Sequence, residues 1–431
     1  MGDQKLPLNA GQQKAASEFF QFLISDEKEM NIAGPGGTGK TFLMGHMIDQ
    51  VLPEYQQTCQ LMGIPSLYNQ VIMTATTNKA AEVLSHSTKR PCSTIHSWMG
   101  LRVSDDYGTG KSILRKSNSW KVHYNEVIFV DECPMIDSPL YKHIQEGTNK
   151  CKVIYVGDDC QMAPVKEPIS PIYTKNMRTV ELLEPMRTSD IHLQALNETM
   201  RNRVPNAEFG PIKLVPGVID HLNGPEMEEA IREAFIQSDN KNRIMAYTND
   251  RVLEFNEHIR EMRQLPTLLT PGECLICNSA FMEGSGNSLP AEARVTVVQA
   301  EQITRKTMLP GDIELEYQEI TILDHFNCMQ TVNVPTNRSY FTQVLKYYAG
   351  QKDWATYFSV KNNYPDLREY DAGTVYKAQG SSYDTAFIDI GNIGTCNRKD
   401  IVARMLYVGV SRARKRVVFY GELPEKYGYF V

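Results

Sequence analysis

The stretch Asn31–Ile48, "NIAGPGGTGKTFLMGHMI", contains the pattern that decides the fold. Its centre, Gly34–Thr41, reads G-x-x-x-x-G-K-T, in which a glycine-rich backbone can close around phosphate oxygens. A short apolar run precedes this pattern and an amphipathic helical pattern follows it. The order matters because the backbone N–H groups at a helix N-terminus attract anions. The stretch therefore predicts a phosphate-binding loop between a strand and a helix.

Two side chains of this loop have expected chemical roles. Lys40 can reach the β- and γ-phosphates of a nucleotide, and Thr41 can ligate Mg²⁺. The remaining loop residues are expected to contact the nucleotide mainly through the backbone. The expected contacts of the loop are Gly34, Pro35, Gly36, Gly37, Thr38, Gly39, Lys40, Thr41 and Phe42.

Short apolar runs recur along the chain, each followed by turn signals. Helical patterns lie between several of them, which predicts an α/β protein with parallel sheets and crossover helices. The runs fall into a group before about residue 190 and a group after about residue 240, so two α/β domains are expected. In chain order the runs are "MNIAG", "QVIMTAT", "EVIFVDE", "KVIYVGDD", "RIMAYTND", "TAFIDIG" and "RVVFYG".

Residues 285–365 interrupt the second α/β pattern. In "DIELEYQEITIL" apolar and polar residues alternate, which indicates antiparallel strands with one solvated face. Aromatic residues follow at helical spacing; we interpret them mainly as core, with stacking on bases as the alternative. A small β-barrel-like subdomain with a helical appendage is expected. The aromatic residues are Tyr340, Phe341, Tyr347, Tyr348, Trp354, Tyr357 and Phe358.

An acid pair follows the third apolar run. Val127–Val130 is a buried-strand pattern that delivers Asp131 and Glu132 to its carboxyl end, where α/β sheets bind ligands. Asp131 is expected to hold Mg²⁺, and Glu132 to orient and deprotonate the attacking water. Behind a complete phosphate loop, this pair predicts a nucleoside triphosphatase.

Other polar residues are placed where they could respond to the γ-phosphate. Asp158 and Gln161 lie in "VGDDCQMAPV", at the end of the next strand pattern. Arg187 in "LLEPMRT" lies between the two α/β halves, and Arg412 in "LYVGVSRARKR" lies in the second. A guanidinium from across a cleft stabilises the transition state only when the domains close. The set fits a motor whose cleft opens and closes with nucleotide state.

Composition sets the class of protein. The chain has 431 residues, 42% hydrophobic and 22% charged, which is ordinary for a soluble globular protein. The net charge of −6 argues against a basic protein that coats DNA. No apolar run approaches the ~18 residues of a membrane span, the start resembles no signal peptide, and nine scattered cysteines fit reduced thiols. Cys274 and Cys277 in "CLIC" lack a second pair for zinc, so this segment is predicted to be a core strand.

The ordered motifs resemble those of superfamily 1 helicases of the 5′→3′, RecD-like subgroup, and most those of the Dda-like helicases of T-even bacteriophages. The match runs from "LNAGQQKA" to the final "RVVFYG". The resemblance implies an ATP-dependent DNA helicase that moves 5′→3′ on single-stranded DNA and unwinds duplexes. It also implies ATP and Mg²⁺ as cofactors, and single-stranded DNA and single/double-strand junctions as partners. Single-strand-binding or other replication proteins are further candidate partners of what is expected to be a monomeric, cytoplasmic motor without a membrane contact, in a bacterium or a phage-infected cell.

The same resemblance implies a domain plan with two RecA-like parallel-sheet domains. The first carries a β-hairpin pin, and the second carries an SH3-like β-barrel with a helical insertion. The implied boundaries are 1–97 and 126–190 for domain 1A, 98–125 for the pin 1B, 191–284 and 366–431 for domain 2A, and 285–365 for the insertion 2B.

Residue roles also follow from the resemblance. Gln12 would read the adenine edge, and Gly380 would contact the nucleotide. Thr76, Tyr376 and Ser382 stand where the family usually has Pro, His and Glu, which affects details of DNA contact and leaves the catalytic groups in place. The residues implied to contact DNA lie in "TATTNKAAEVL", "STIHS", "RIMAYTND" and "GTVYKAQG" and are Thr77, Lys79, Thr94, His96, Thr248, Asn249, Thr374, Lys377 and Gln379.

A second stretch, "GTGKS" at Gly108–Ser112, looks like the end of a phosphate loop but lacks its context. Asp105 occupies the position of the first glycine, no apolar strand precedes the stretch, and no amphipathic helix follows it. Gly108 and Gly110 suit a hairpin turn instead.

The surroundings of this turn are basic. Residues 100–124 hold five Lys or Arg and two acids, a net +3 that can lie against DNA phosphates. The resemblance implies that a pin inserted here splits the incoming duplex. Tyr107 is the expected wedge, with Trp120, Ile113 and Leu114 as alternatives.

Two other functions stay open at this point. The chain could be a DNA-stimulated ATPase that acts as a clamp or remodelling switch without strand separation. A helicase–nuclease subunit is disfavoured because no acid cluster outside the motor motifs suggests a nuclease centre. The intact set of phosphate-loop, acid and arginine residues favours the motor.

Overall fold

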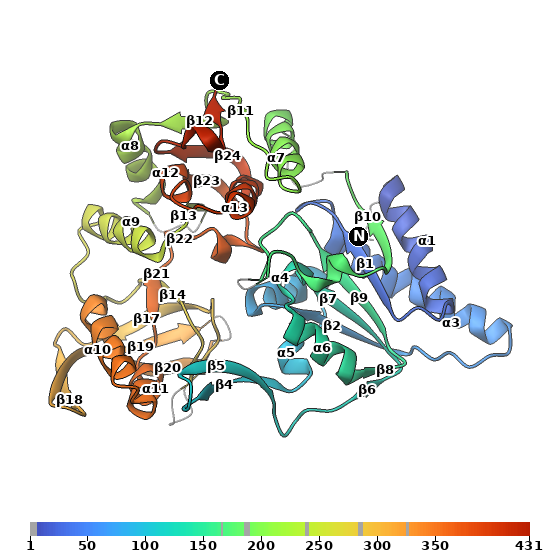
Figure 1. Ribbon diagram of the computed structural model, residues 1–431, viewed down its shortest axis with the longest axis horizontal. Helices are drawn as coiled ribbons and strands as arrows, with labels where there is room; N and C mark the ends of the chain where they lie inside the picture. The colour runs from blue at the N-terminus through green and yellow to red at the C-terminus, as the bar shows by residue number, and fades with distance from the viewer. Residues whose placement is uncertain (1–6, 165–166, 185–189, 238–240, 283–287, 325–326) are drawn as a thin grey trace. The chain divides into compact units, whose positions relative to one another are not determined.

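The computed structural model of the protein describes residues 7–164, 167–184, 190–237, 241–282, 288–324 and 327–431 (Figure 1). The chain forms two compact units, each built from separate segments. The first unit contains the residues up to Arg102, Lys116–His221 and Ala378–Val431. The second contains Val103–Arg115 and Leu222–Lys377.

A parallel sheet lies at the centre of the first unit. Its inner strands are apolar because helices cover both faces of a sheet of this kind. Val127–Val130 are completely buried, and the four apolar runs predicted before residue 190 are all strands here. In spatial order the strands are β10 (Arg178–Glu181), β1 (Glu29–Ala33), β9 (Lys152–Gly157), β7 (Glu126–Asp131), β2 (Gln70–Ala75) and β3 (Ser93–Thr94).

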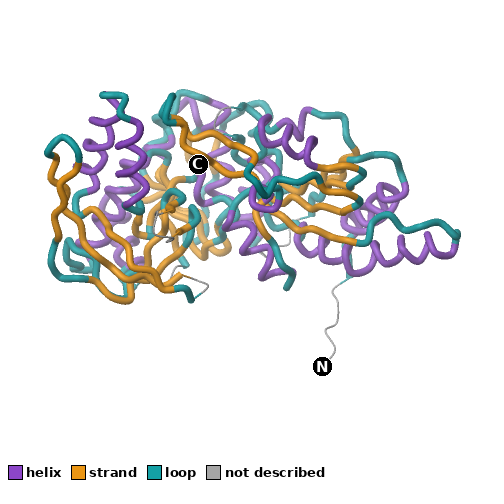
Figure 2. Tube along the Cα trace, turned by 90° about the horizontal axis from the view of Figure 1, so that it is seen from below, coloured by secondary structure: helices purple, strands orange, loops and turns teal. Residues whose placement is uncertain are grey.

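Helices lie on both sides of these strands in the view of Figure 2. A core that includes Phe19, Phe129 and Val156 joins the first helix to the sheet. Within the described residues, no helix combines the length and apolar character that a bilayer span requires. The helices of the first unit are α1 (Ala10–Ile24), α2 (Lys40–His46), α3 (Leu52–Leu61), α4 (Asn78–Thr88), α5 (Ile95–Trp98), α6 (Ser138–Gly147), α7 (Ile191–Arg203), α12 (Ile390–Ile393) and α13 (Lys399–Ser411).

The apolar runs predicted after residue 240 are also parallel strands. In the first unit, β23 (Tyr383–Asp389) pairs in parallel with β24 (Ala413–Tyr420). In the second unit, β13 (Asn242–Ala246) pairs in parallel with β22 (Ala372–Thr374). The α/β class predicted from the sequence is therefore confirmed. Shorter strands of the first unit are β6 (His123–Tyr124), β8 (Thr148–Asn149), β11 (Pro211–Ile212) and β25 (Tyr429–Phe430), and β12 (Ile219–Leu222) ends at the first residue of the next segment.

An antiparallel sheet dominates the second unit, as the alternation in "DIELEYQEITIL" predicted. It extends beyond the predicted range 285–365 at both ends, because the "CLIC" segment and Leu367–Glu369 are two of its strands. Leu275 and Cys277 are fully buried in its core. The strands are β14 (Cys274–Cys277), β17 (Arg294–Ala300), β18 (Arg305–Leu309), β19 (Ile313–Asp324), β20 (Met329–Pro335) and β21 (Leu367–Glu369), and β15 (Phe281–Met282) pairs separately with β16 (Ser288–Leu289).

Four helices in the described part of the second unit accompany this sheet. The aromatic stretch predicted as core belongs to the last two, and its residues differ in burial. Phe358 and Tyr348 are buried, whereas Tyr340 and Tyr347 are 39% and 49% exposed. The core interpretation therefore holds for part of the stretch. The helices are α8 (Gly224–Phe235), α9 (Asn249–Met262), α10 (Arg338–Gly350) and α11 (Trp354–Asn363).

The second "GTGK" stretch is the turn of a β-hairpin, as predicted. Strands β4 (Leu101–Asp106) and β5 (Lys111–Lys116) pair with each other. The turn closes through hydrogen bonds from the Thr109 and Gly110 N–H groups to the Asp106 carbonyl at 3.2 and 2.8 Å.

The hairpin tip packs on α11 within the second unit. The Tyr107 ring meets the Phe358 ring edge-on at 5.4 Å between centroids. Asn362 donates a hydrogen bond to the Asp105 carboxylate at 3.1 Å. A Cβ atom at Gly110 would lie 2.4 Å from the Trp354 ring, and Gly110 has a φ of 67°. Glycine is therefore required at this position of the turn.

Candidate nucleotide pocket and nucleic-acid contacts

The predicted catalytic residues of the first unit converge on a pocket of about 200 Å³. The phosphate loop forms one side, and residues after β7 and β9 and near the C-terminus form the rest. Most of its lining residues were predicted from the sequence; Ala80 and Val83 of α4 were not. The lining residues are Gly36, Gly37, Gly39, Lys40, Thr41, Ala80, Val83, Asp131, Glu132, Gln161, Gly380 and Arg412.

The phosphate loop has the expected local structure. Gly39 has a φ of 78° and caps α2, which begins at Lys40. The Lys40 amine donates to the carbonyls of Gly34 and Pro35 at 2.7 and 2.9 Å. A Cβ at Gly34 would lie 2.3 Å from the Leu182 carbonyl, so the first glycine of the motif permits close backbone packing. The loop thus presents a helix N-terminus and an ammonium group to the pocket.

The acid pair lies beside this loop. Asp131 is the last residue of β7, and its carboxylate accepts a hydrogen bond from the Glu132 N–H at 3.0 Å. Burial raises the pKa of Asp131, the Glu132 carboxylate raises it further, and the Lys40 ammonium opposes both. A bound cation would favour the ionised form of such a carboxyl group. With the Thr41 hydroxyl in the same pocket, the oxygen donors fit Mg²⁺.

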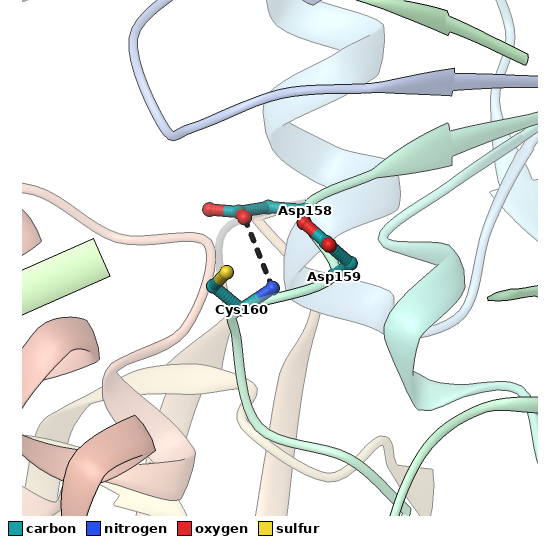
Figure 3. A group of neighbouring side chains, drawn as sticks. All are labelled: Asp158, Asp159 and Cys160. Atoms are coloured by element: carbon teal, nitrogen blue, oxygen red, sulfur yellow. Dashed lines mark hydrogen bonds between the residues drawn. The ribbon is translucent and has the colours of Figure 1, made fainter. Parts of the chain in front are cut away.

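The segment after β9 is held by polar contacts, and Figure 3 shows its Asp158, Asp159 and Cys160 side chains. Asp158 is fully buried and accepts a hydrogen bond from the Cys160 N–H at 3.2 Å. The Tyr407 hydroxyl donates to the Asp158 carboxylate at 2.6 Å. Burial and this carboxylate raise the pKa of Tyr407 well above its usual range, so the hydroxyl stays a donor.

Two arginines complete these contacts. Arg201 on α7 pairs with Asp159 at 2.9 Å and approaches Asp158 at 3.6 Å. Arg404 on α13 donates to the Asp159 carbonyl at 2.6 Å and also to the Gln161 carbonyl. The carboxylates of Asp158 and Asp159 are therefore paired with Arg201. The position of Gln161 is fixed through its backbone carbonyl, which accepts a hydrogen bond from Arg404.

Arg412 is buried and lines the pocket. Its guanidinium donates to the Ser411 hydroxyl at 2.8 Å, the Val408 carbonyl at 3.2 Å and the Ser381 carbonyl at 3.3 Å. Gln379, predicted as a DNA contact, donates to the Gln161 side chain at 3.3 Å. This contact links the segment around Gly380 to the end of β9.

Other predicted nucleotide contacts lie around the loop. The buried Gln12 forms a capping box with Asn9, and its amide donates to the Thr38 carbonyl at 3.2 Å. The Thr38 hydroxyl donates to the Pro35 carbonyl at 3.0 Å. Phe42 is on α2 and is 39% exposed. Arg187, the remaining predicted catalytic residue, lies outside the described residues.

The predicted DNA contacts of the first unit lie at two helix starts. Thr77 and Thr94 cap α4 and α5, where their side chains accept hydrogen bonds from backbone N–H groups. Lys79 forms an ion pair with Glu82 at 3.0 Å. Burial lowers the pKa of His96, so this side chain is neutral near pH 7. Each cap leaves further backbone N–H groups that can bind a phosphate.

Other predicted DNA contacts belong to the second unit. Thr248 caps α9, and the Asn249 amide oxygen accepts from Arg368 at 3.2 Å. The Thr374 hydroxyl accepts from the Lys377 N–H at 3.4 Å. The Lys377 amine pairs with Glu292 at 3.0 Å and also contacts Asn278. Tyr107 is 59% exposed at the hairpin tip.

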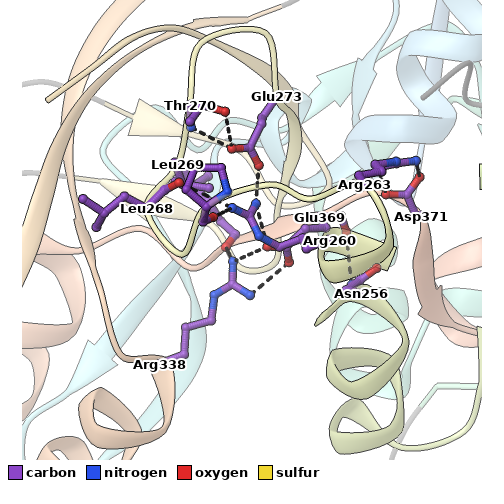
Figure 4. A network of polar contacts seen from close by, with 12 residues as sticks. Asn256, Arg260, Arg263, Leu268, Leu269, Thr270, Glu273, Arg338, Glu369 and Asp371 are labelled. Atoms are coloured by element: carbon purple, nitrogen blue, oxygen red, sulfur yellow. Dashed lines mark hydrogen bonds and ion pairs between the residues drawn. The ribbon is translucent and has the colours of Figure 1, made fainter. Parts of the chain in front are cut away.

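A buried polar network fixes α9 to its neighbours in the second unit (Figure 4). Arg260 and Arg338 share the Glu369 carboxylate at 3.5 and 3.0 Å. Arg263 binds Asp371 in a bidentate pair, and Asn256 bridges the Glu369 carbonyl and the Ala372 N–H. Because Ala372 begins β22, the network holds the middle and the end of α9 beside the strand that ends at Thr374.

Sequence reasoning missed the residues that support Gln161. Arg404 and Tyr407 lie three residues apart on α13 and therefore on one helix face, directed toward the segment after β9. Their polar atoms within an otherwise apolar helix were the available signal. Arg201 carried no comparable signal, because α7 contains several other polar residues.

Comparisons with known proteins agree with this architecture. Residues 7–211 match the family model of an AAA domain, and residues 370–420 match that of the UvrD-like helicase C-terminal domain. The ATP-dependent DNA helicase dda of Enterobacteria phage T4 is 24% identical, covering 96% of this chain and 99% of that protein. An uncharacterized protein of Acanthamoeba polyphaga mimivirus, R530, is 20% identical, covering 95% and 99%.

Solved structures show the same fold. The Pif1 helicase from Bacteroides, in complex with ADP-AlF3 and ssDNA, has a TM-score of 0.53 and 13% identity, covering 98% of this chain and 95% of that one. A Pif1 structure from work on unwinding at forked dsDNA has a TM-score of 0.50 and 13% identity, covering 98% and 94%. The resemblance predicted from the motifs is thus confirmed.

Proposed function

We propose that this chain is a superfamily 1, ATP-dependent DNA helicase that moves 5′→3′ on single-stranded DNA and separates duplex strands. The observation that carries the proposal is the pocket itself, where Lys40, the acid pair, Gln161 and Arg412 meet. A binding module that does not hydrolyse nucleotide needs a phosphate loop but not this full set. The similarity to a phage helicase over nearly the whole chain supports the same conclusion.

In the proposed reaction, each residue acts on a defined part of ATP. The loop N–H groups and Lys40 hold the β- and γ-phosphates, and Glu132 takes a proton from the attacking water. Gln161 and Arg412 meet the γ-phosphate, and Arg187 is proposed as a second guanidinium. Thr41 and Asp131 would hold Mg²⁺, which when bound neutralises charge on the phosphates. Gln12 and Gly380 would contact the rest of the nucleotide.

We propose that DNA follows the helix starts and loops with hydroxyl, amide and lysine groups. Such groups bind phosphates without reading bases, so sequence preference should be slight. The proposed contacts are Thr77, Lys79, Thr94, His96, Thr248, Asn249, Thr374, Lys377 and Gln379. Several of these side chains already have protein partners, so DNA would exchange with those partners or use the neighbouring backbone.

The hairpin of β4 and β5 is proposed as the strand-separating pin. Its exposed Tyr107 and basic flanks suit contact with bases and phosphates at a junction. Opening one base-pair step costs ~1.4 kcal/mol on average, which ATP hydrolysis can supply if the wedge prevents re-pairing. In this proposal the domain plan is the one the resemblance implies, with the motor monomeric in the cytoplasm. Single-strand-binding or other replication proteins are its proposed partners.

The test compares two duplexes that carry a single-stranded tail at either the 5′ or the 3′ side. We expect ATP-dependent strand separation of the 5′-tailed duplex and little of the 3′-tailed one. A Lys40→Ala variant serves as the control for strand separation that does not need hydrolysis. Preference for the 3′ tail would overturn the direction. DNA-stimulated hydrolysis with neither duplex opened would favour the alternative of a clamp or remodelling switch.

A further inference from the structure

Glu132 has an unusual backbone conformation for the residue proposed to activate water. Its φ and ψ are 53° and 43°, in the left-handed region that residues with a Cβ rarely adopt. The conformation costs ~1–2 kcal/mol for a residue other than glycine. Surrounding contacts must therefore hold it.

Thr76 supplies two of those contacts. Strands β2 and β7 pair in parallel up to Ala75 opposite Asp131. Directly beyond this pair, the Thr76 N–H donates to the Asp131 carbonyl at 3.2 Å, and its hydroxyl donates to the Glu132 carbonyl at 2.9 Å. Thr76 thus binds the backbone of both acids in succession.

The position of Thr76 fits this task. Its side chain is 8% exposed, so water competes little for the hydroxyl. The Glu132 carbonyl also accepts from the Met135 N–H at 3.2 Å, which closes the turn that follows. The peptide unit after Glu132 is therefore fixed from two sides, while its side chain lines the pocket.

We infer that Thr76 is a positioning residue that holds the left-handed Glu132 so that its carboxylate faces the γ-phosphate. The inference rests on the proposed function. It also gives a role to Thr76, which stands where the resembling helicase family usually has proline. Proline there would have neither an N–H nor a hydroxyl to donate. Thr76 also precedes Thr77, the cap of α4, so the same short segment joins a proposed DNA contact to the water-activating residue.

The experiment uses the full chain with Thr76→Val, which keeps the shape and the N–H but removes the hydroxyl, and Thr76→Ser, which retains it. Steady-state ATP hydrolysis is measured with saturating oligo-dT, and oligo-dT affinity is measured by fluorescence anisotropy. We expect Thr76→Val to lower kcat about tenfold, as for the loss of one buried hydrogen bond. We expect KM for ATP and DNA affinity to change less than about twofold, because neither ligand binds Thr76. Thr76→Ser should restore most of kcat.

A second arm asks whether Thr76 acts through Glu132. In a Glu132→Gln background, Thr76→Val should have no further effect on kcat, because the group it positions is already lost. An unchanged kcat in Thr76→Val, an additive double variant, or a parallel loss of DNA affinity would overturn the inference. If Thr76→Val does not fold, Thr76→Ala against Thr76→Ser makes the same comparison. Wild-type protein without ATP hydrolysis would instead sink the proposed function.

Discussion

The two "GTGK" stretches use the same residues for different structures. In the first, Gly39 has a positive φ and Lys40 begins a helix. In the second, Gly110 also has a positive φ, but Lys111 begins a strand. The shared element is only a left-handed glycine before a lysine. The structure that follows depends on what flanks it, because a buried strand precedes the first and Asp106 closes a turn before the second.

The difference has a chemical consequence for the two lysines. The Lys40 amine donates hydrogen bonds to the Gly34 and Pro35 carbonyls of its own phosphate loop, and Lys40 lines the pocket. Lys111 is the first residue of β5, directly after the hairpin turn, and is exposed. A phosphate would therefore find several converging N–H groups at the first site and a single solvated charge at the second.

The largest expected effect comes from removing each lysine in turn. Lys40→Ala should reduce ATP hydrolysis by at least about 10²–10³-fold, the usual loss when a group that stabilises transition-state charge is removed. Lys111→Ala is the matched variant and should leave hydrolysis within about twofold. Phosphate release with saturating oligo-dT measures both. Near-normal turnover in Lys40→Ala would break the comparison and the nucleotide-site assignment with it.

An intermediate effect is expected from Tyr407→Phe. This variant tests the segment after β9, which lies beside the first "GTGK" stretch and has no counterpart at the second. The variant removes the hydroxyl that donates to the buried Asp158 carboxylate, and so loosens the segment that carries Gln161. We expect kcat for ATP to fall about tenfold, because the buried Asp158 carboxylate loses one of its hydrogen-bond donors. KM for ATP should change little, since Tyr407 does not line the pocket.

Tyr420→Phe provides a control for the loss of a tyrosine hydroxyl elsewhere in the same unit, in β24. It should leave kcat within about twofold. Equal losses in the two variants would show that the loss in Tyr407→Phe does not come from its bond to Asp158.

The sequence predicts those parts of the pocket that depend on residues close together in the chain, and misses those that depend on residues far apart. The loop, the strand before Asp131 and the hairpin turn at Gly110 follow from neighbouring residues, so local pattern is enough. The bonds of Tyr407 to Asp158 and of Thr76 to Glu132 join residues far apart in the chain, and only tertiary packing creates them. Gln379 marks the boundary: its motif was recognised, but its contact with Gln161 was not predicted.

The smallest effect on ATP hydrolysis is expected at the hairpin tip. Tyr107→Ala removes the exposed ring proposed to stack on a base, a contact worth ~1–3 kcal/mol. We expect unwinding of a 5′-tailed duplex to slow by about five- to tenfold, with oligo-dT-stimulated hydrolysis within twofold. Gel-based unwinding and phosphate-release assays on the same preparation measure the two quantities.

Tyr124→Ala is the matched control, because Tyr124 is 58% exposed and lies outside the hairpin. It should leave unwinding within about twofold of the wild type. Parallel loss of unwinding and hydrolysis in Tyr107→Ala would count against a wedge that is separate from the motor.

The hairpin tip and the helix on which it packs are synthesised at different times. Its packing partner on α11 is translated about 240 residues after Gly110, which at ~5–20 residues per second means a delay on the order of 10–50 s. The turn bonds to Asp106 are local and can form within ~1–10 μs. The hairpin turn can therefore form on the ribosome before α11, its packing partner, has been synthesised. In a nascent chain that stops before Trp354, the turn can form, but Tyr107 has no ring of α11 to contact.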